Sequence, residues 1–209
     1  DYPYSKSMGC RFNSQDFHFA ESVLLKKAVK RVFILGNLNL VEKFEAVIRR
    51  PEIDDLEDLN ELSKKSWLKG FQDILSEHEL DRAQEKEDFI TEESLKQNLE
   101  SDGCRSLIFE ENGKVVGKVR LAWTEEEMHD IAEPCKNEVQ LRSFYVHPDQ
   151  WRQGIGSRLL EKIIEEAPEW AETLKVEALE NSDAVKFYRK NGFKRVESGT
   201  FSAEDTELV

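Results

Sequence analysis

Two glycines, Gly154 and Gly156, have the spacing in this chain that most clearly suggests chemistry. They follow Arg152 and precede Ser157, between a strand-like and a helix-like pattern. A helix start carries unpaired N–H groups and a partial positive charge, and glycine lets a ligand approach the backbone. The segment is suited to an anion such as a pyrophosphate. A tight turn without a ligand is the commoner explanation of a lone Gly-x-Gly.

Two well-known phosphate-binding patterns do not fit this loop. A Rossmann dinucleotide fingerprint needs a third glycine where the chain has Leu159. A P-loop needs Gly-Lys followed by Ser or Thr, which the sequence lacks. A loop of another kind would have to bind the anion.

Hydrophobic patterning predicts the elements that position the loop. Residues 139–146 alternate apolar and polar side chains, which predicts a strand that Pro148 ends. The following helix should stop at Pro168 and has one apolar face, made of Leu159, Leu160, Ile163, Ile164 and Ala167. Residues 174–178 predict the next strand, and Asn181 or Ser182 can cap the helix after it.

The rest of the chain predicts further strands and helices. Asn112-Gly113 is a hairpin signal between two strands, and residues 92–100 predict a short helix. A charge-rich loop or weak helix is expected over residues 76–90. Further elements are a strand at 46–50, a helix after Asp54 or Asp55, and two final strands at 193–196 and 206–209.

The N-terminal segment is predicted to be an extension of the domain. Apolar residues recur at helical spacing over residues 16–35. This helix would either pack on its own domain or serve assembly, for example of a homodimer. We expect residues 1–45 to form the extension and residues 46–209 to form one domain.

Two blocks of sequence together resemble a known enzyme family. The block QLRSFYVHPDQWRQGIGSRLLE resembles motif A of the GNAT superfamily of N-acetyltransferases. The block NSDAVKFYRKNGF, residues 181–193, is similar to that family's second signature. Two blocks in the right order are more specific than either alone, and the resemblance covers about residues 46–209. Trp151 departs from it, because the family usually has Gln or Arg there.

The resemblance implies a mixed α/β fold: a twisted, mostly antiparallel sheet of six to seven strands with helices on both faces. The strands at 139–146 and 174–178 would run parallel and separate, so that acetyl-CoA inserts between them. It implies that Asn181 and Tyr188 reach the thioester end of acetyl-CoA. The other cofactor-binding residues would be Phe144, Tyr145, Val146, Arg152, Gln153, Gly154, Ile155, Gly156 and Ser157.

The resemblance implies transfer of an acetyl group to a primary amine, with Tyr188 as general acid. Gln140 stands where many relatives have Glu, and an amide cannot accept the proton. Glu138 lies two residues away on the same strand face and could act through a water oriented by Gln140. Alternatively, solution supplies the neutral amine and no base lies on this strand. A non-catalytic acyl-CoA sensor or interaction module is the alternative function.

Charge limits the partners. The net charge is −13, and residues 1–50 carry +4 against −17 for the rest. Such an acidic body argues against nucleic-acid binding and is compatible with a cationic acceptor, either a small molecule or a peptide.

Cysteine usage and hydropathy limit the cofactors and the compartment. Cys10, Cys104 and Cys135 make no metal-binding pattern, so no metal is expected. The apolar run at residues 32–35 is too short for a signal or a membrane span, so we expect a cytoplasmic protein without membrane contact.

Overall fold

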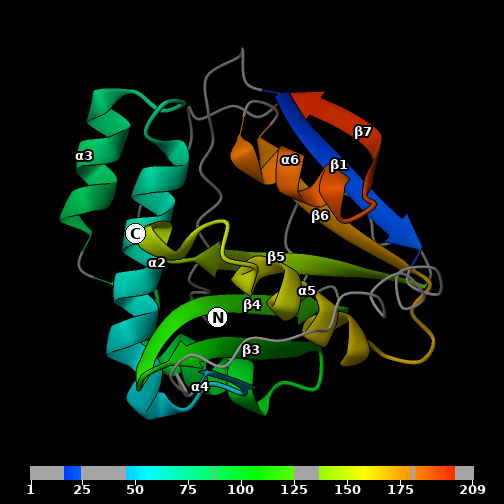
Figure 1. Ribbon diagram of the computed structural model, residues 1–209, viewed down its shortest axis with the longest axis horizontal. Coiled ribbons are helices and arrows are strands. Elements are labelled where there is room, and N and C mark those ends of the chain that lie inside the picture. Colours follow the sequence, from blue (N-terminus) through cyan, green and yellow to red (C-terminus); the bar gives the residue numbers. More distant parts are fainter. Residues whose placement is uncertain (1–16, 25–45, 87, 125–136, 180–181, 201–209) are drawn as a thin grey trace, which may run out of the picture.

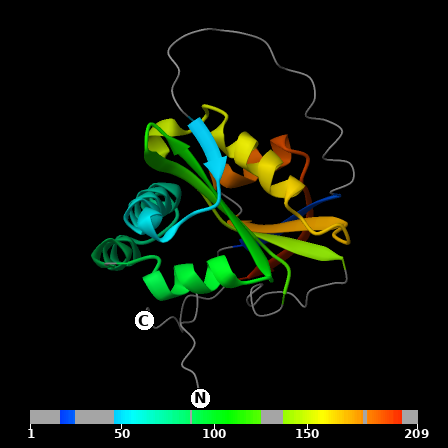
Figure 2. The same ribbon diagram turned by 90° about the horizontal axis from the view of Figure 1, so that it is seen from below.

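The computed structural model describes residues 17–24, 46–86, 88–124, 137–179 and 182–200. In these residues a seven-stranded sheet is covered by helices on both faces (Figure 1). Figure 2 shows the two helical layers, with α5 (Ile155–Glu165) and α6 (Asp183–Lys190) on one face. The opposite face is covered by α2 (Leu56–Phe71), α3 (Glu77–Glu85) and α4 (Glu92–Glu100).

The strands follow the order β2-β3-β4-β5-β6-β1-β7. Only the β5–β6 pair is parallel, and every other neighbouring pair is antiparallel. The predicted mixed α/β fold with a mostly antiparallel sheet is therefore confirmed. The strands are β1 (Phe17–Leu24), β2 (Ala46–Arg49), β3 (Cys104–Glu111), β4 (Lys114–Ala122), β5 (Glu138–Val146), β6 (Thr173–Leu179) and β7 (Lys194–Thr200).

The predicted helix over residues 16–35 is wrong where the structure describes it. Residues 17–24 form β1, which pairs antiparallel with β6 on one side and with β7 on the other. The apolar residues do recur at helical spacing, but long-range pairing overrides that local pattern. The domain boundary at residue 45 stays a prediction, although β1 shares its sheet with the other strands. Residues 25–45 and the strand predicted at 206–209 lie outside the described residues.

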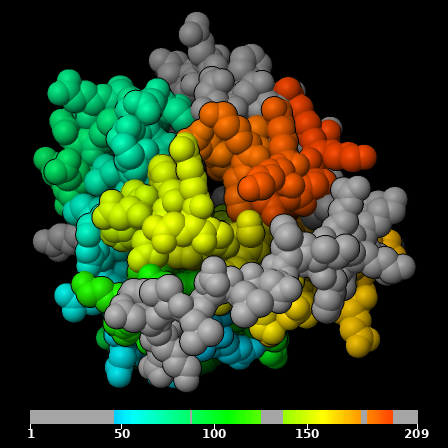
Figure 3. Space-filling view, viewed as in Figure 1, coloured from blue at the N-terminus to red at the C-terminus, as the bar shows by residue number. Residues whose placement is uncertain are grey.

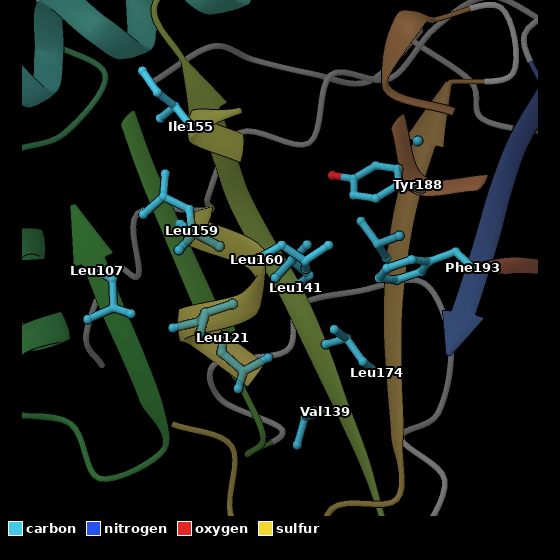
Figure 4. Packing of buried hydrophobic residues seen from close by; sticks show 14 of the residues in the cluster. Leu107, Leu121, Val139, Leu141, Ile155, Leu159, Leu160, Leu174, Tyr188 and Phe193 are labelled. Atoms are coloured by element: carbon cyan, nitrogen blue, oxygen red, sulfur yellow. The ribbon is translucent and has the colours of Figure 1, made fainter. Parts of the chain in front are cut away.

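The main core lies between the sheet and the α5–α6 layer (Figure 4). α5 buries Ile155, Leu159, Leu160 and Ile163, each at most 4% exposed. Burying one such side chain stabilises the fold by about 1.5–3 kcal/mol. α5 lies so close to β4 that a Cβ at Gly117 would meet Leu159 Cδ1 at 2.8 Å. The apolar face predicted for this helix is therefore the one that holds it on the sheet.

Most predicted local signals are found in the structure. Asn112 and Gly113 both have positive φ, 53° and 75°, as a tight hairpin between β3 and β4 requires. The helix predicted at 92–100 is α4. Within the charge-rich stretch 76–90, α3 is capped by Ser76, whose hydroxyl accepts from Glu79 N. None of the described helices is long and apolar enough to cross a membrane.

Candidate functional site

The centre of the site is the point where β5 and β6 separate. Their parallel pairing runs from Glu138↔Thr173 to Leu141↔Val176 and goes no further, although both strands continue. Figure 1 shows the two strands diverging from this paired end. On its other side β5 stays paired with β4, with a bulge around Ser143, which has φ +45°. The second half of β5 thus has backbone groups that β6 does not pair.

Alternation along β5 decides which backbone groups face β6. His147 N donates to Val116 O of β4 at 2.8 Å. Alternation then directs the backbone N–H and C=O of Tyr145 toward β4 as well, and those of Phe144 and Val146 away from it. Of the three residues predicted to contact the cofactor here, Tyr145 therefore has no backbone group on the β6 side.

The Val146 carbonyl is already paired in the structure. It accepts a hydrogen bond from Trp151 Nε1 at 2.6 Å and one from Ser66 Oγ at 3.0 Å. Trp151 is the residue that departs from the family pattern, and its indole links the loop before α5 to the open half of β5. This leaves the backbone of Phe144 and the N–H of Val146 as the groups that face the open side.

The glycine loop forms the N-terminus of α5. Gly154 is the N-cap, with φ +88°, and Arg152 is also left-handed, with φ +66°. The first helical bond starts at Arg158 N, which donates to Gly154 O at 3.1 Å. No side chain caps this end and its first turn holds no carboxylate, so its N–H groups can take an anion. The Ile155 side chain is buried, whereas Gln153 and Ser157 are exposed.

α6 brings Tyr188 to the same region. Its ring packs with Phe144 of β5 at a centroid distance of 6.4 Å and with Phe187 and Phe193 at 5.4 and 5.2 Å. Figure 4 shows the hydroxyl of Tyr188 directed toward the β5 side. A Cβ on Gly156 would meet Phe187 Cε2 at 3.2 Å, so the glycine also permits close packing of the loop on α6.

Figure 3 shows that the loop and α6 adjoin on one face of the molecule, with α2 and α3 beyond them. The positive charge of Arg152 also contributes to lowering the pKa of Asp183 on α6, after the larger effect of its Lys186 partner. Asn181, also predicted to contact the cofactor, lies outside the described residues. The described residues contain no cluster of His, Cys, Asp and Glu that could hold a metal ion.

Charged side chains lie on the opposite face of the same two strands. Glu138 and Lys175 form an ion pair at 2.9 Å, with side chains only 14% and 16% exposed. Gln140 is 8% exposed and donates from Nε2 to Glu177 Oε1 at 3.2 Å. Arg142 Nη1 in turn donates to Gln140 Oε1 at 3.3 Å. The predicted relay from Glu138 through Gln140 stays a prediction, and the structure pairs each of the two with a different residue.

Glu177 is the residue of this cluster that sequence reasoning missed. Burial raises the pKa of its carboxyl, against the lowering effects of Arg142, the Gln140 hydrogen bond and Lys175. The signal in the sequence is weak, because one Glu on an alternating strand usually marks a solvated face. The contact of Glu177 with Gln140 can be recognised only once the pairing of β5 with β6 is known.

Lys118 on β4 is a second partly buried titratable group near the site. Its Nζ donates to Ser63 Oγ of α2 at 2.7 Å and lies 5.3 Å from the ring centroid of Tyr145. Loss of solvation, helped by the positive charge of Arg120, lowers the pKa of Lys118 to about 7. Tyr145 therefore packs on the α2 side of the sheet, away from Tyr188.

Comparison with known proteins identifies the family. The family described as Acetyltransferase (GNAT) family matches residues 57–193. The probable N-acetyltransferase Rv2775 of Mycobacterium tuberculosis is 30% identical over 136 residues, which cover 65% of this chain and 72% of that protein.

Two solved structures share the fold at lower identity. The PaiA N-acetyltransferase of Thermoplasma acidophilum, solved with coenzyme A, aligns with a TM-score of 0.58 and 22% identity, covering 75% of this chain and 99% of that one. A transcriptional regulator from Bacillus halodurans aligns with a TM-score of 0.54 and 20% identity, covering 74% and 97%. The family match spans more than half of the sequence, and the chain is a member of the acetyltransferase (GNAT) family.

Proposed function

We propose that this protein is an acetyl-CoA-dependent N-acetyltransferase that moves the acetyl group to a primary amine of a small molecule or peptide. The observation that carries the proposal is the separation of β5 from β6 beside an uncapped, glycine-started helix and a buried tyrosine. The coenzyme A bound in the Thermoplasma structure supports the choice of cofactor class.

Each part of the cofactor has a complementary group in this arrangement. The pyrophosphate would lie at the α5 N-terminus, against Arg152 and the N–H groups of the first turn. The amide-rich pantetheine arm would pair with the open backbone of β5, as an added strand would. The thioester would then lie near Tyr188, whose phenol protonates the leaving thiolate.

A non-catalytic acyl-CoA sensor is the second candidate, and two observations favour it. Gln140 puts an amide where many relatives have a carboxylate, and Trp151 already holds the Val146 carbonyl. Such a module would bind the cofactor at the same loop and release no thiol in the presence of amines.

Release of free thiol from acetyl-CoA, followed with a panel of primary amines, separates the two functions. The panel should include polyamines, amino acids and peptides with a free N-terminus or lysine. We expect amine-dependent release for at least one member. Binding of acetyl-CoA by calorimetry without release for any amine would favour the sensor.

The variant Gly154→Glu tests whether the loop before α5 binds the cofactor. The substitution places a bulky, negatively charged side chain where the pyrophosphate would bind. The residue has φ +88°. We expect acetyl-CoA affinity to fall more than about tenfold, ~1.4 kcal/mol. Unchanged affinity in a folded variant would remove the loop from the cofactor site.

A further inference from the structure

A carboxylate stands where β5 and β6 separate, and nothing in the proposed reaction has yet used it. The last paired residues of the two strands are Leu141 and Val176, so Glu177 is the first residue of β6 beyond the pairing. Its Oε1 accepts from Gln140 Nε2 at 3.2 Å, which fixes the carboxylate against β5. The cofactor's reactive end would arrive at this same separation.

Tyr188 and Glu177 approach the separation from opposite faces of the sheet. Leu174, Val176 and Ala178 are buried in the core that includes Tyr188. Alternation along β6 therefore puts Glu177 on the other face, together with Lys175. A thioester between the strands would have the Tyr188 phenol on one side and the Glu177 carboxylate on the other. This arrangement suits an acid that protonates the leaving thiolate and a base that takes a proton from the attacking amine.

The charges around Glu177 come from several elements. β5 contributes Glu138 and Arg142, and β6 contributes Lys175, which is held by Glu138. β4 places Arg120 opposite Arg142, and the register of β1 places the uncharged Ala20 opposite Glu177. Burial outweighs these positive neighbours and raises the pKa of the Glu177 carboxyl above its ordinary value, which makes it a stronger base than an ordinary glutamate.

We propose that Glu177 is the general base that accepts a proton from the acceptor ammonium, an inference that rests on the proposed acetyltransferase function. The ammonium gives one proton to the Glu177 carboxylate, and the neutral amine forms the C–N bond to the thioester carbon. The C–S bond breaks, and Tyr188 gives its proton to the thiolate. The second proton lost by the nitrogen restores the Tyr188 phenol, and Glu177 releases its proton to solvent.

Other groups nearby are less suited to this role. Glu138 is committed to Lys175 in a partly buried ion pair, and Gln140 is an amide. Lys118 has a depressed pKa, but it lies under α2 and is bonded to Ser63. Glu138 and Lys118 are the alternatives that the experiment must separate from Glu177.

The test is the pH profile of kcat/KM for Glu177→Gln, measured with acetyl-CoA and the best amine of the panel. The amide keeps the shape and still accepts from Gln140, so the fold is retained. We expect kcat/KM to fall roughly 10²-fold at pH 7 and the deficit to shrink as pH rises, because solution then supplies neutral amine. Glu169→Gln, an exposed carboxylate after α5, controls for the loss of one negative charge and should match the wild type.

Stability provides a readout that does not depend on activity. Between the ordinary glutamate pKa and the raised one, the folded protein holds the Glu177 proton while the unfolded chain has lost it. Stability should therefore fall as pH rises through that window, and Glu177→Gln should abolish this fall. Urea unfolding of both proteins at several pH values measures it.

The outcomes are distinguishable. A wild-type protein that releases no thiol with any amine would overturn the proposed function itself. An active wild type whose kcat/KM at pH 7 is unchanged in Glu177→Gln would overturn only the base assignment. A deficit at pH 7 that shrinks as pH rises in Glu138→Gln or Lys118→Met instead would give the role to that residue. Acetyl-CoA affinity should be nearly the same in all these variants, because none changes the α5 loop or a backbone group of β5.

Discussion

The two faces of the β5–β6 region are built from the same two strands in opposite ways. On the α5–α6 face the side chains are apolar or aromatic, and most are almost fully buried. On the other face an ion pair, a glutamine–glutamate contact and a desolvated lysine occupy the space. Burying charges is costly even when they are paired. One face thus stabilises the fold, and the other holds two groups with shifted pKa values: the pKa of Glu177 is raised and that of Lys118 is lowered to about 7.

Truncation of a side chain on the apolar face should have the largest effect on the stability of the fold. Leu159 is 0% exposed and touches the position of Gly117, so Leu159→Ala leaves a cavity between α5 and β4. We expect the free energy of unfolding to fall by about 2–5 kcal/mol, measured by urea denaturation. A loss below about 1 kcal/mol would mean that the core collapses around the gap and that the contrast between the faces is smaller than described.

Tyr188 is the exception on the apolar face, and its hydroxyl should matter for rate more than for stability. Tyr188→Phe keeps the ring in the cluster with Phe144, Phe187 and Phe193. We expect kcat to fall roughly 10²-fold with little change in acetyl-CoA affinity or melting temperature. Single-turnover kinetics measures the rate, and calorimetry measures the acetyl-CoA affinity and the melting temperature. Activity within about twofold of the wild type would make Tyr188 an ordinary core aromatic.

The prediction for Lys118, on the charged face, concerns how stability changes with pH rather than a rate. Its pKa is about 7 in the folded protein and 10.5 in the unfolded chain. Between these values the unfolded chain binds more protons, so stability should rise with pH. Lys118→Met should flatten that rise, because methionine binds no proton in either state.

Unfolding in urea from pH 7 to pH 10 measures this slope. Lys162→Met is the control, because the pKa of that exposed lysine is raised by Glu165 rather than lowered. A wild-type profile that is already flat would show that Lys118 stays charged.

What the sequence could predict depended on how local each signal was. The glycine loop and α5 follow from an apolar period and two glycines within one short segment, and the structure has them as expected. β1 could not be found in this way, because its strand conformation comes from pairing with β6 and β7. Glu177 and the bond from Trp151 to the Val146 carbonyl were missed for the same reason, since both depend on neighbours across the fold.

The place of β1 in the sheet bears on how the protein folds. Its partners in β6 lie 149 to 161 residues further along the chain, from Leu24↔Thr173 to His18↔Leu179. At about 5–20 residues per second, a ribosome needs roughly 10–30 s to make that stretch after β1 has emerged. β1 must wait for its partners, and contacts of such long range slow folding. We therefore expect β6 and β7 to complete their pairing with β1 last, after the sheet from β2 to β5 has formed.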